Sequence, residues 1–421
     1  MRRRIKTIIL IPCVLSMLVF LMLSCNSGNK EKTKMEMNEY QKGTFGYALK
    51  ILKNADNNLV VLKDKSGESQ IIVSAHFQGK VFTSSAEGLT GNSFGWVNFE
   101  LIKSGDRLEH MNGYGSEDRL WIGPEGGQFS VFFKPGGAMD FSNWFTPAPF
   151  DYEPWELISK TDTKVEIKKD MILKNYSGTE FNIRVNRNVS LLSKFGIQNL
   201  LNIEIPVNVK QVGFESENII TNTGDNSWTK KSGTISIWML SMFNTSPGAT
   251  VVIPYHEGDE KELGKIATTN YFGEISDERL LIKDGAIYFK VDGKKRRKLG
   301  LAPGRVKPVS GSYDETNGVL TIVQYSVPED NNEYVNQLWP WQDKPFIGDV
   351  MNSYNDGPLE DGTQMGPFYE IESSSPAAFL APEENLVHYH RVIHFVGGKK
   401  ELNKISVKVL GVTIEQIIKA F

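Results

Sequence analysis

Alternation of apolar and polar residues with a period of two is the dominant pattern along the chain. From residue 181 to residue 191 the apolar side chains share one parity, and Arg187 alone interrupts that apolar face. Two further apolar runs, at residues 59–62 and 70–73, flank the turn-forming sequence Asp-Lys-Ser-Gly at 64–67. Similar short runs follow, separated by Gly, Asn and Asp. This pattern predicts an all-β sandwich or barrel.

Helical patterns are few. A short helix is expected at residues 194–201, and two more close the chain at 401–410 and 413–420. Gly411 suits the position just after a helix, and Thr413 with Gln416 three residues later resembles a capping box. No strand–helix alternation of the parallel-sheet type is present, so an α/β fold is not expected.

The first 25 residues have the layout of a bacterial lipoprotein signal. Four basic residues lie within the first six positions, an uncharged apolar run covers residues 8–23, and Ser24-Cys25 follows. This layout predicts cleavage before Cys25 and lipid attachment to its thiol. The alternative, an uncleaved membrane anchor, requires a longer apolar run. The polar residues 26–40 are expected to form a flexible tether.

Composition restricts the chemistry of the remaining body, residues 41–421, which is expected to be a single β-sandwich domain. The only cysteines are Cys13, which the signal carries away, and Cys25, so the body offers neither a disulfide nor a catalytic thiol. Loss of the basic signal leaves the body four units more negative than the −3 of the full chain. Nucleic acid is therefore not an expected partner. The expected location is the cell envelope, anchored by lipid in the outer membrane.

Residues 110–155 mix Gly, Pro and aromatic residues with a few charges. Aromatic faces stack on sugar rings, while carboxylate and guanidinium groups bind hydroxyls. Candidate substrate-binding residues here are Arg119, Trp121, Glu125 and Trp144. The alternative is a turn-rich crossing of the core with buried ion pairs.

Residues 334–358 have a similar composition. Trp339 and Trp341 flank a proline, and Asn352, Asn355 and Asp356 follow at short spacing. All five are candidate substrate-binding residues. Calcium or another divalent metal is an alternative ligand for these oxygens, although no calcium-loop motif is present and no cofactor is expected. An ordinary long loop would also fit.

Residues 368–394 hold the candidate catalytic groups. Glu370 and Glu372 are two apart, as are His388 and His390, so each pair lies on one face of a strand. Carboxylate and imidazole groups brought together by adjacent strands would suit proton transfer. A His/Glu metal site and a solvated edge strand are the alternatives.

This last segment resembles the C-terminal signature of galactose-mutarotase-like proteins. An acidic strand leads to a turn in which Leu380, Pro382 and Glu384 match the family's leucine-x-Pro-Gly-Glu sequence, with Glu383 at the glycine. Gly-Lys-Val at 79–81, Gly-Trp-Val-Asn at 95–98 and the run at 117–127 are also similar to a family of Bacteroidota lipoproteins with that fold.

The resemblance implies a galactose-mutarotase-like β-supersandwich with short C-terminal helices and a sugar on its concave face. By position it implies that Glu370 or Glu372 is the base and that Arg119 binds substrate. Mutarotases also carry an acid histidine in mid-chain. The only candidate here, His256, stands in a different sequence order.

Three hypotheses follow. The body is a carbohydrate-binding or carbohydrate-processing protein, with epimerase-like or lyase-like chemistry left open. Alternatively, it is a non-catalytic surface module that recognises a glycan or a protein, or a structural envelope protein. Convergence of the two glutamates, the two histidines and Arg119 in one pocket would favour the first hypothesis, and side chains pointing to separate solvent faces would contradict it.

Overall fold

Antiparallel strands organise residues 40–421, the part of the chain that this computed structural model describes. The predicted signal, the lipidation at Cys25 and nearly all of the tether lie outside the described residues. Gly43–Phe421 forms one compact unit. The described part is 37% strand and 15% helix, which confirms a mostly β fold with a few short helices.

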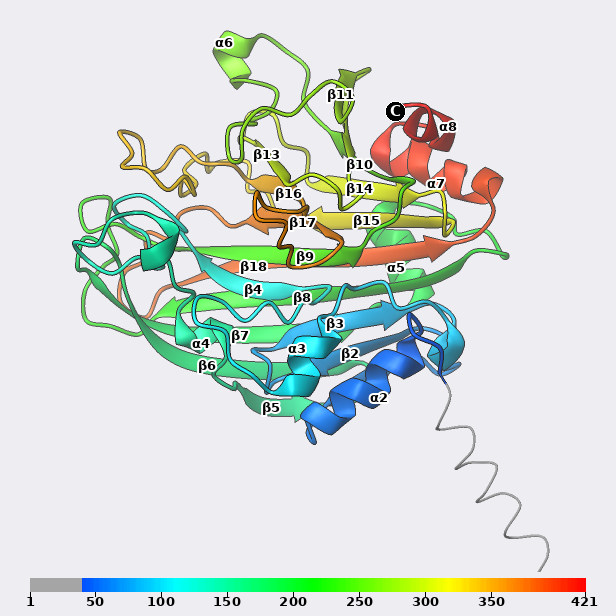
Figure 1. The fold of residues 1–421 in the computed structure, drawn as a ribbon, viewed down its shortest axis with the longest axis horizontal. Coiled ribbons are helices and arrows are strands. Elements are labelled where there is room, and N and C mark those ends of the chain that lie inside the picture. The colour runs from blue at the N-terminus through cyan, green and yellow to red at the C-terminus, as the bar shows by residue number, and fades with distance from the viewer. Residues whose placement is uncertain (1–39) are drawn as a thin grey trace, which may run out of the picture. The chain divides into compact units, whose positions relative to one another are not determined.

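The largest sheet has ten strands in the order β11-β12-β10-β14-β15-β18-β8-β7-β6-β5 (Figure 1). Every neighbouring pair in it is antiparallel. Its strands are β5 (Glu156–Lys160), β6 (Lys164–Lys174), β7 (Glu180–Leu191), β8 (Lys210–Asn222), β10 (Ala249–Pro254), β11 (Leu280–Lys283), β12 (Ala286–Lys290), β14 (Val309–Asp314), β15 (Val319–Tyr325) and β18 (Asn385–Val396).

A second sheet has five strands in the order β13-β16-β17-β9-β4. They are β4 (Arg119–Gly123), β9 (Ser236–Asn244), β13 (Arg297–Leu301), β16 (Met351–Asn355) and β17 (Phe368–Ser374). The segments paired here come from the whole length of the body, so the sheet depends on long-range contacts. Its strands are almost entirely buried, because both of its faces are covered.

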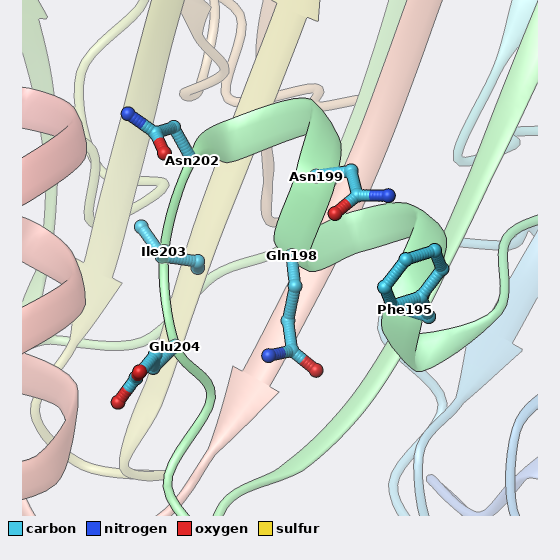
Figure 2. Close-up of a pocket in the computed structure, with 6 residues that line it drawn as sticks. All are labelled: Phe195, Gln198, Asn199, Asn202, Ile203 and Glu204. Atoms are coloured by element: carbon cyan, nitrogen blue, oxygen red, sulfur yellow. The ribbon is translucent and has the colours of Figure 1, made fainter.

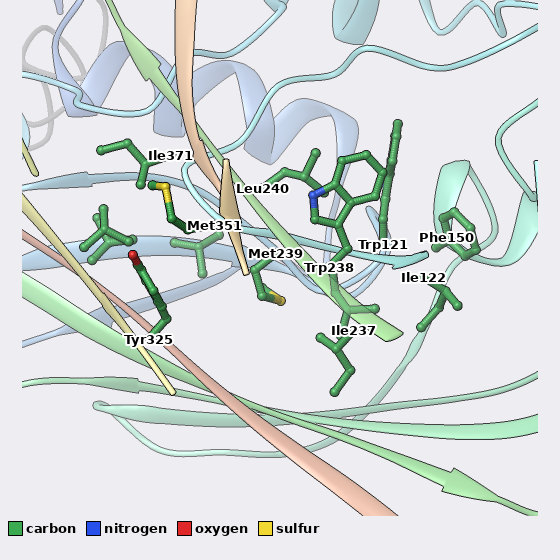
Figure 3. Packing of buried hydrophobic residues seen from close by; sticks show 14 of the residues in the cluster. Trp121, Ile122, Phe150, Ile237, Trp238, Met239, Leu240, Tyr325, Met351 and Ile371 are labelled. Atoms are coloured by element: carbon green, nitrogen blue, oxygen red, sulfur yellow. The ribbon is translucent and has the colours of Figure 1, made fainter. Parts of the chain in front are cut away.

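One face of the five-stranded sheet packs against the ten-stranded sheet. Figure 3 shows Ile237 and Met239 leaving β9 on one side, and Trp238 and Leu240 leaving it on the other. Ile237 and Met239 share a hydrophobic cluster with residues of β7, β8 and β15. The opposite face, which points away from the ten-stranded sheet, is called the outer face below.

A third sheet, β1 (Val60–Lys63), β2 (Gln70–Ser74) and β3 (Lys80–Ser85), borders the second, because Val81 of β3 forms an isolated bridge with Asp118. The hairpin of β1 and β2 confirms the prediction for residues 59–73. Helices α2 (Phe45–Ala55) and α3 (Phe99–Ser104) pack against this sheet. Helix α2 was not predicted, although Thr44 caps its N-terminus by accepting a hydrogen bond from the Tyr47 amide.

Helices α5 (Lys194–Leu201), α7 (Lys399–Leu410) and α8 (Ile414–Ile418) cover the far face of the ten-stranded sheet. All three were predicted. Gly411 is left-handed at the end of α7, and Thr413 with Gln416 forms the expected capping box. The remaining short helices are α4 (Ala148–Asp151), α6 (Glu260–Leu263), η1 (Gly88–Thr90) and η2 (Phe141–Asn143).

Arg187, the one charged residue on the apolar face of β7, is fully buried and forms an ion pair with Asp118. Its Nε also donates to the Gly79 carbonyl at 2.8 Å, and Asn218 of β8 accepts a further hydrogen bond. The sequence anomaly is therefore an ionic cross-link between the ten-stranded sheet and the β3–β4 junction. Such a pair is stable in the interior only because each charge has its partner.

Replacing Arg187 by Met would leave the Asp118 carboxylate buried without its cation. We expect the free energy of unfolding in urea to fall by about 3–5 kcal/mol. The control is Arg184→Met on the same strand, which removes a half-exposed pair with Asp170 and should cost far less. Equal losses in the two variants would contradict the cross-link.

Candidate functional site

The register of the five-stranded sheet collects charged residues on its outer face. Glu372 of β17 pairs with Asn352 of β16 on one side and with Leu240 of β9 on the other. Leu240 in turn pairs with Arg119 of β4. Since residues paired across a sheet point to the same face, these side chains form one row on the outer face. Glu370, two residues before Glu372, lies on the same face.

Arg119 and Glu370 form a buried ion pair on the outer face. The Arg119 Nη2 lies 3.0 Å from Glu370 Oε1, and both side chains are almost completely shielded from solvent. The guanidinium also lies over the ring of Trp121, 4.4 Å from its centroid. Arg119 therefore lies on the same face as the two glutamates and contacts Glu370 directly.

Glu372 is held by two donors that sequence reasoning missed. Trp238 Nε1 donates to Glu372 Oε2 at 2.8 Å, and Lys298 Nζ lies 2.8 Å from the same oxygen. The Lys298 ammonium also lies over the Trp238 ring at 4.9 Å and over the Tyr271 ring at 5.4 Å. The outer face thus carries two carboxylate–cation pairs, with Trp238 bound to Glu372 and Trp121 lying against Arg119.

Burial shifts the protonation of two carboxyl groups here. It raises the pKa of Glu370 to about 7, with Arg119 opposing the shift and the Glu372 charge adding to it. It also raises the pKa of Asp349 to about 6, against hydrogen bonds from the Tyr271 hydroxyl at 2.8 Å and from Thr268. Both groups therefore change charge near neutral pH, as acid/base groups must.

Glu125, Trp144 and Trp339 form the rim of the site. Trp339 Nε1 donates to Glu125 Oε1 at 2.9 Å, and the Trp144 ring stacks on Trp339 with 6.2 Å between centroids. Burial raises the pKa of Glu125, while Lys298 lowers it. Glu125 and Trp339 are only partly buried, so the site approaches the surface at this rim.

Several buried polar atoms at this site have no hydrogen-bond partner in the protein. They are Nε of Arg119, Oε1 of Glu372, Oγ of Ser236, Nε2 of Gln337 and Nε1 of Trp144. A buried polar atom without a partner costs free energy, so such atoms are rare away from places where they meet a ligand or water. Five such atoms at the outer face make this face the candidate functional site.

Lys80 extends the row and was also missed. Because Val81 pairs with Asp118, Lys80 lies beside Arg119 in the register. Burial, and then the charge of Arg119, lower the pKa of Lys80 to about 7. Its Nζ hydrogen-bonds to Gln78. No local sequence signal could identify Lys80 or Lys298, because each reaches the site only through strand pairing.

The prediction that His388 and His390 share this site with the glutamates is wrong. Ser373, which points to the opposite face of β17, lies 2.8 Å from His388 Nε2 and 2.8 Å from His390 Nδ1. Both rings are therefore buried between the two large sheets. Burial lowers the pKa of His388 to about 3 and that of His390 to about 4, so both are neutral near pH 7.

Two further predicted residues, Asn355 and Trp341, lie elsewhere. Asn355 points away from the outer face, where its side chain accepts from the Gly293 amide and donates to the Lys295 carbonyl. Asp356 lies next to the site: its carboxylate accepts from the Tyr354 hydroxyl, whose strand position pairs with Glu370, and from the Gly366 amide, and its charge helps to raise the pKa of Glu370. Trp341 is 68% exposed. Asn352 does lie in the row, beside Glu372.

Residues 40–421 contain no group of three or more His, Cys, Asp or Glu side chains arranged to hold a metal ion. In the same residues, no helix is long and apolar enough to cross a membrane.

A separate groove of about 500 Å³ lies beside helix α5 (Figure 2). Figure 2 shows Phe195 and Asn199 on one side of the helix and Ile203 with Glu204 beyond its end. The groove contains none of the residues predicted from the sequence.

A sequence family described as a family of unknown function (DUF6786) matches residues 43–421. A comparison with curated proteins found no similar sequence. Similar solved structures include a putative aldose 1-epimerase from Escherichia coli K12, at 13% identity and a TM-score of 0.47, with 80% of this chain and 98% of that chain covered. A galactose mutarotase-like protein from Lactobacillus casei is similar at 9% identity and a TM-score of 0.46, with 80% and 100% covered.

The two neutral histidines make stability depend on pH. An unfolded histidine binds a proton below about pH 6.5, whereas His388 and His390 do so only near 3 and 4. Their contribution is thus fully present above pH 6.5 and is lost as the pH falls. Between pH 7 and pH 5 we expect each to account for about 2 kcal/mol of the loss.

Urea unfolding at pH 7 and pH 5 measures this effect. The variants His388→Gln and His390→Gln should each lose less stability over that interval than the wild type. Glu370 and Asp349, whose raised pKa values act in the opposite direction, are common to all three proteins. The exposed His76 provides a control for the substitution itself, since His76→Gln removes an imidazole outside the core. If His388→Gln and His390→Gln lost as much stability between pH 7 and pH 5 as the wild type, the interpretation that these imidazoles are buried and neutral would be wrong.

Proposed function

The chain belongs to this family of unknown function, DUF6786, and from the geometry of its outer face we propose that it binds a carbohydrate there and transfers a proton to or from it. One observation carries the proposal: Glu370 and Glu372 lie side by side on the outer face, each paired with its own cation, with Trp121 against Arg119 and Trp238 hydrogen-bonded to Glu372. This combination of hydrogen-bonding groups and aromatic faces matches the chemistry of a sugar ring.

The charges of the site favour a neutral sugar. The positive charges of Arg119 and Lys298 balance the negative charges of the two glutamates. These two ion pairs therefore leave no unpaired charge to attract a charged ligand. Hydroxyl groups, which both donate and accept, would instead satisfy the free atoms of Arg119 and Glu372. Trp121 and Trp238, which contact each other edge to face at 5.6 Å, provide apolar surface beside these groups.

Glu370 is the proposed base. A carboxylate with a pKa near the working pH exchanges protons most effectively, and that of Glu370 is raised to about 7. Arg119, 3.0 Å away, would stabilise negative charge that develops on a sugar oxygen. Epimerisation and lyase-type elimination both begin with such a proton transfer.

Binding without catalysis is the second candidate, and Leu240 favours it. This apolar residue separates Glu372 from Arg119 in the row, so β9 supplies no proton donor between them. His388 and His390 are on the other side of the sheet. An enzyme would then need Lys298 or a water molecule as its acid.

Glu370→Gln tests the base. With D-galactose or D-glucose as probe, followed by polarimetry for anomer exchange and by NMR for other products, we expect turnover to fall about 10²–10⁴-fold. Wild-type turnover should rise with pH through about 7, because the ionised carboxylate is the active form. Sugar affinity, measured by calorimetry, should change much less than turnover.

The control is Glu215→Gln, which removes a carboxylate from an ion pair with Arg391 on the ten-stranded sheet. Glu372→Gln should weaken binding, since it removes the negative charge that pairs with Lys298 and replaces one acceptor oxygen beside Trp238 by an amide donor. Unchanged turnover in both the Glu370 and Glu372 variants would exclude acid/base chemistry. Sugar binding that survives in Glu370→Gln but is lost in Glu372→Gln, without any wild-type turnover, would favour the binding protein.

We also propose that Cys25 carries lipid and holds the body at the outer membrane. The support is the sequence alone: a basic start, an apolar run and a cysteine directly after Ser24. The body would then meet its sugar outside the cytoplasm.

Metabolic labelling with a palmitate analogue tests the anchor. Cys25→Ser should abolish labelling and release the protein from the membrane fraction. Cys13→Ser is the matched control and should remain labelled and membrane-bound, because that residue lies in the cleaved signal. Labelling that persists in Cys25→Ser would refute the proposal.

A further inference from the structure

A second groove lies next to the rim of the outer-face site. It has a volume of about 420 Å³, within the range of small-ligand pockets. We call it the Trp341 groove; it is lined by Asn336, Leu338, Pro340, Trp341, Gln342, Asp343, Lys344 and Ile347. All of these residues belong to one loop.

The same loop also contributes to the outer-face site. Gln337 accepts from the Glu125 amide at 2.6 Å, and Trp339 donates to the Glu125 carboxylate at 2.9 Å. Asn336 and Leu338, the residues on either side of Gln337, line the groove instead. One side of the loop thus completes the rim of the buried site, and the other forms an open surface directly next to it.

The loop is held in place by its own hydrogen bonds. Tyr334 and Ile347 form a bridge at its base. The side-chain amide of Gln128 binds the backbone of Gln342 twice, with Gln128 Nε2 donating to the Gln342 carbonyl at 2.8 Å and the Gln342 backbone N–H donating to Gln128 Oε1 at 3.1 Å. The groove is therefore preformed, which reduces the entropy lost when a ligand binds.

The lining of the groove indicates its ligand. Trp341 is 68% exposed and Ile347 is 62% exposed, so an aromatic face and an aliphatic one are open to solvent. Asp343 and Lys344 supply one charge of each sign, and Asn336 supplies an amide, whereas the amide of Gln342 donates to the Asn336 and Leu338 carbonyls of the loop itself. An aromatic platform with an amide and no net charge suits a neutral sugar ring.

We propose that the ligand of this protein is an oligosaccharide, with one sugar residue at the outer-face site and the next residues on the Trp341 groove. The inference rests on the proposed carbohydrate function and extends it to the class of substrate. The position of the groove supports this inference. Trp339 and Glu125 are partly exposed residues of the outer-face site, and they are hydrogen-bonded to each other. Trp339 belongs to the same loop that lines the groove.

Calorimetry with matched probes tests the proposal: D-glucose, D-galactose and D-mannose, each compared with its linear tetrasaccharide. For at least one sugar we expect the wild type to bind the tetrasaccharide about ten-fold more tightly than the monosaccharide. Trp341→Ala should bring that ratio close to one. Since Trp341 is largely exposed, its removal leaves the core intact.

Phe195→Ala is the control. Phe195 is 72% exposed and lines the groove beside helix α5, so its loss should leave the ratio unchanged. A tetrasaccharide advantage that survives in Trp341→Ala, or equal wild-type affinity for every matched pair, would overturn the oligosaccharide proposal alone. Binding that is insensitive to Glu372→Gln and Arg119→Met, or no binding of any sugar, would count against the underlying carbohydrate function.

Discussion

The two faces of the five-stranded sheet have opposite environments, and the rest of the molecule is arranged around that constraint. Successive side chains of a strand point to opposite faces. On β17 this sends Ile371 and Ser373 toward the ten-stranded sheet and sends Glu370 and Glu372 to the outer face. A shift of the register by one residue would bury both carboxylates among apolar side chains, so the packing of the two sheets also fixes the site.

Buried charge is the second organising feature, and it appears in pairs. Arg187 with Asp118 links the sheets, while Arg119 with Glu370 and Lys298 with Glu372 lie on the outer face. The structural pair has further partners on both ions, whereas the outer-face pairs leave free atoms on Arg119 and Glu372. That difference separates an ion pair that stabilises the fold from ion pairs that are available to a ligand.

The local sequence was a good guide to individual elements. Apolar alternation located β7, and the Gly411 and Thr413 signals located the closing helices, because these features depend on residues close together in the chain. Helix α2 was missed, and the division of the strands into three sheets was not predicted. Strand order is decided by pairing between distant segments, which local patterns do not record.

The sequence by itself determined that Glu370 and Glu372 share a face, and that His388 and His390 share a face, since the period of a strand requires both. Only the tertiary structure decided that the two pairs lie on opposite sides of one sheet. It also decided that Arg119, 251 residues before Glu370, is the partner of that carboxylate. The physical reason is the same in each case: parity is a property of one strand, whereas register and sheet packing are properties of strands that meet only in the folded chain.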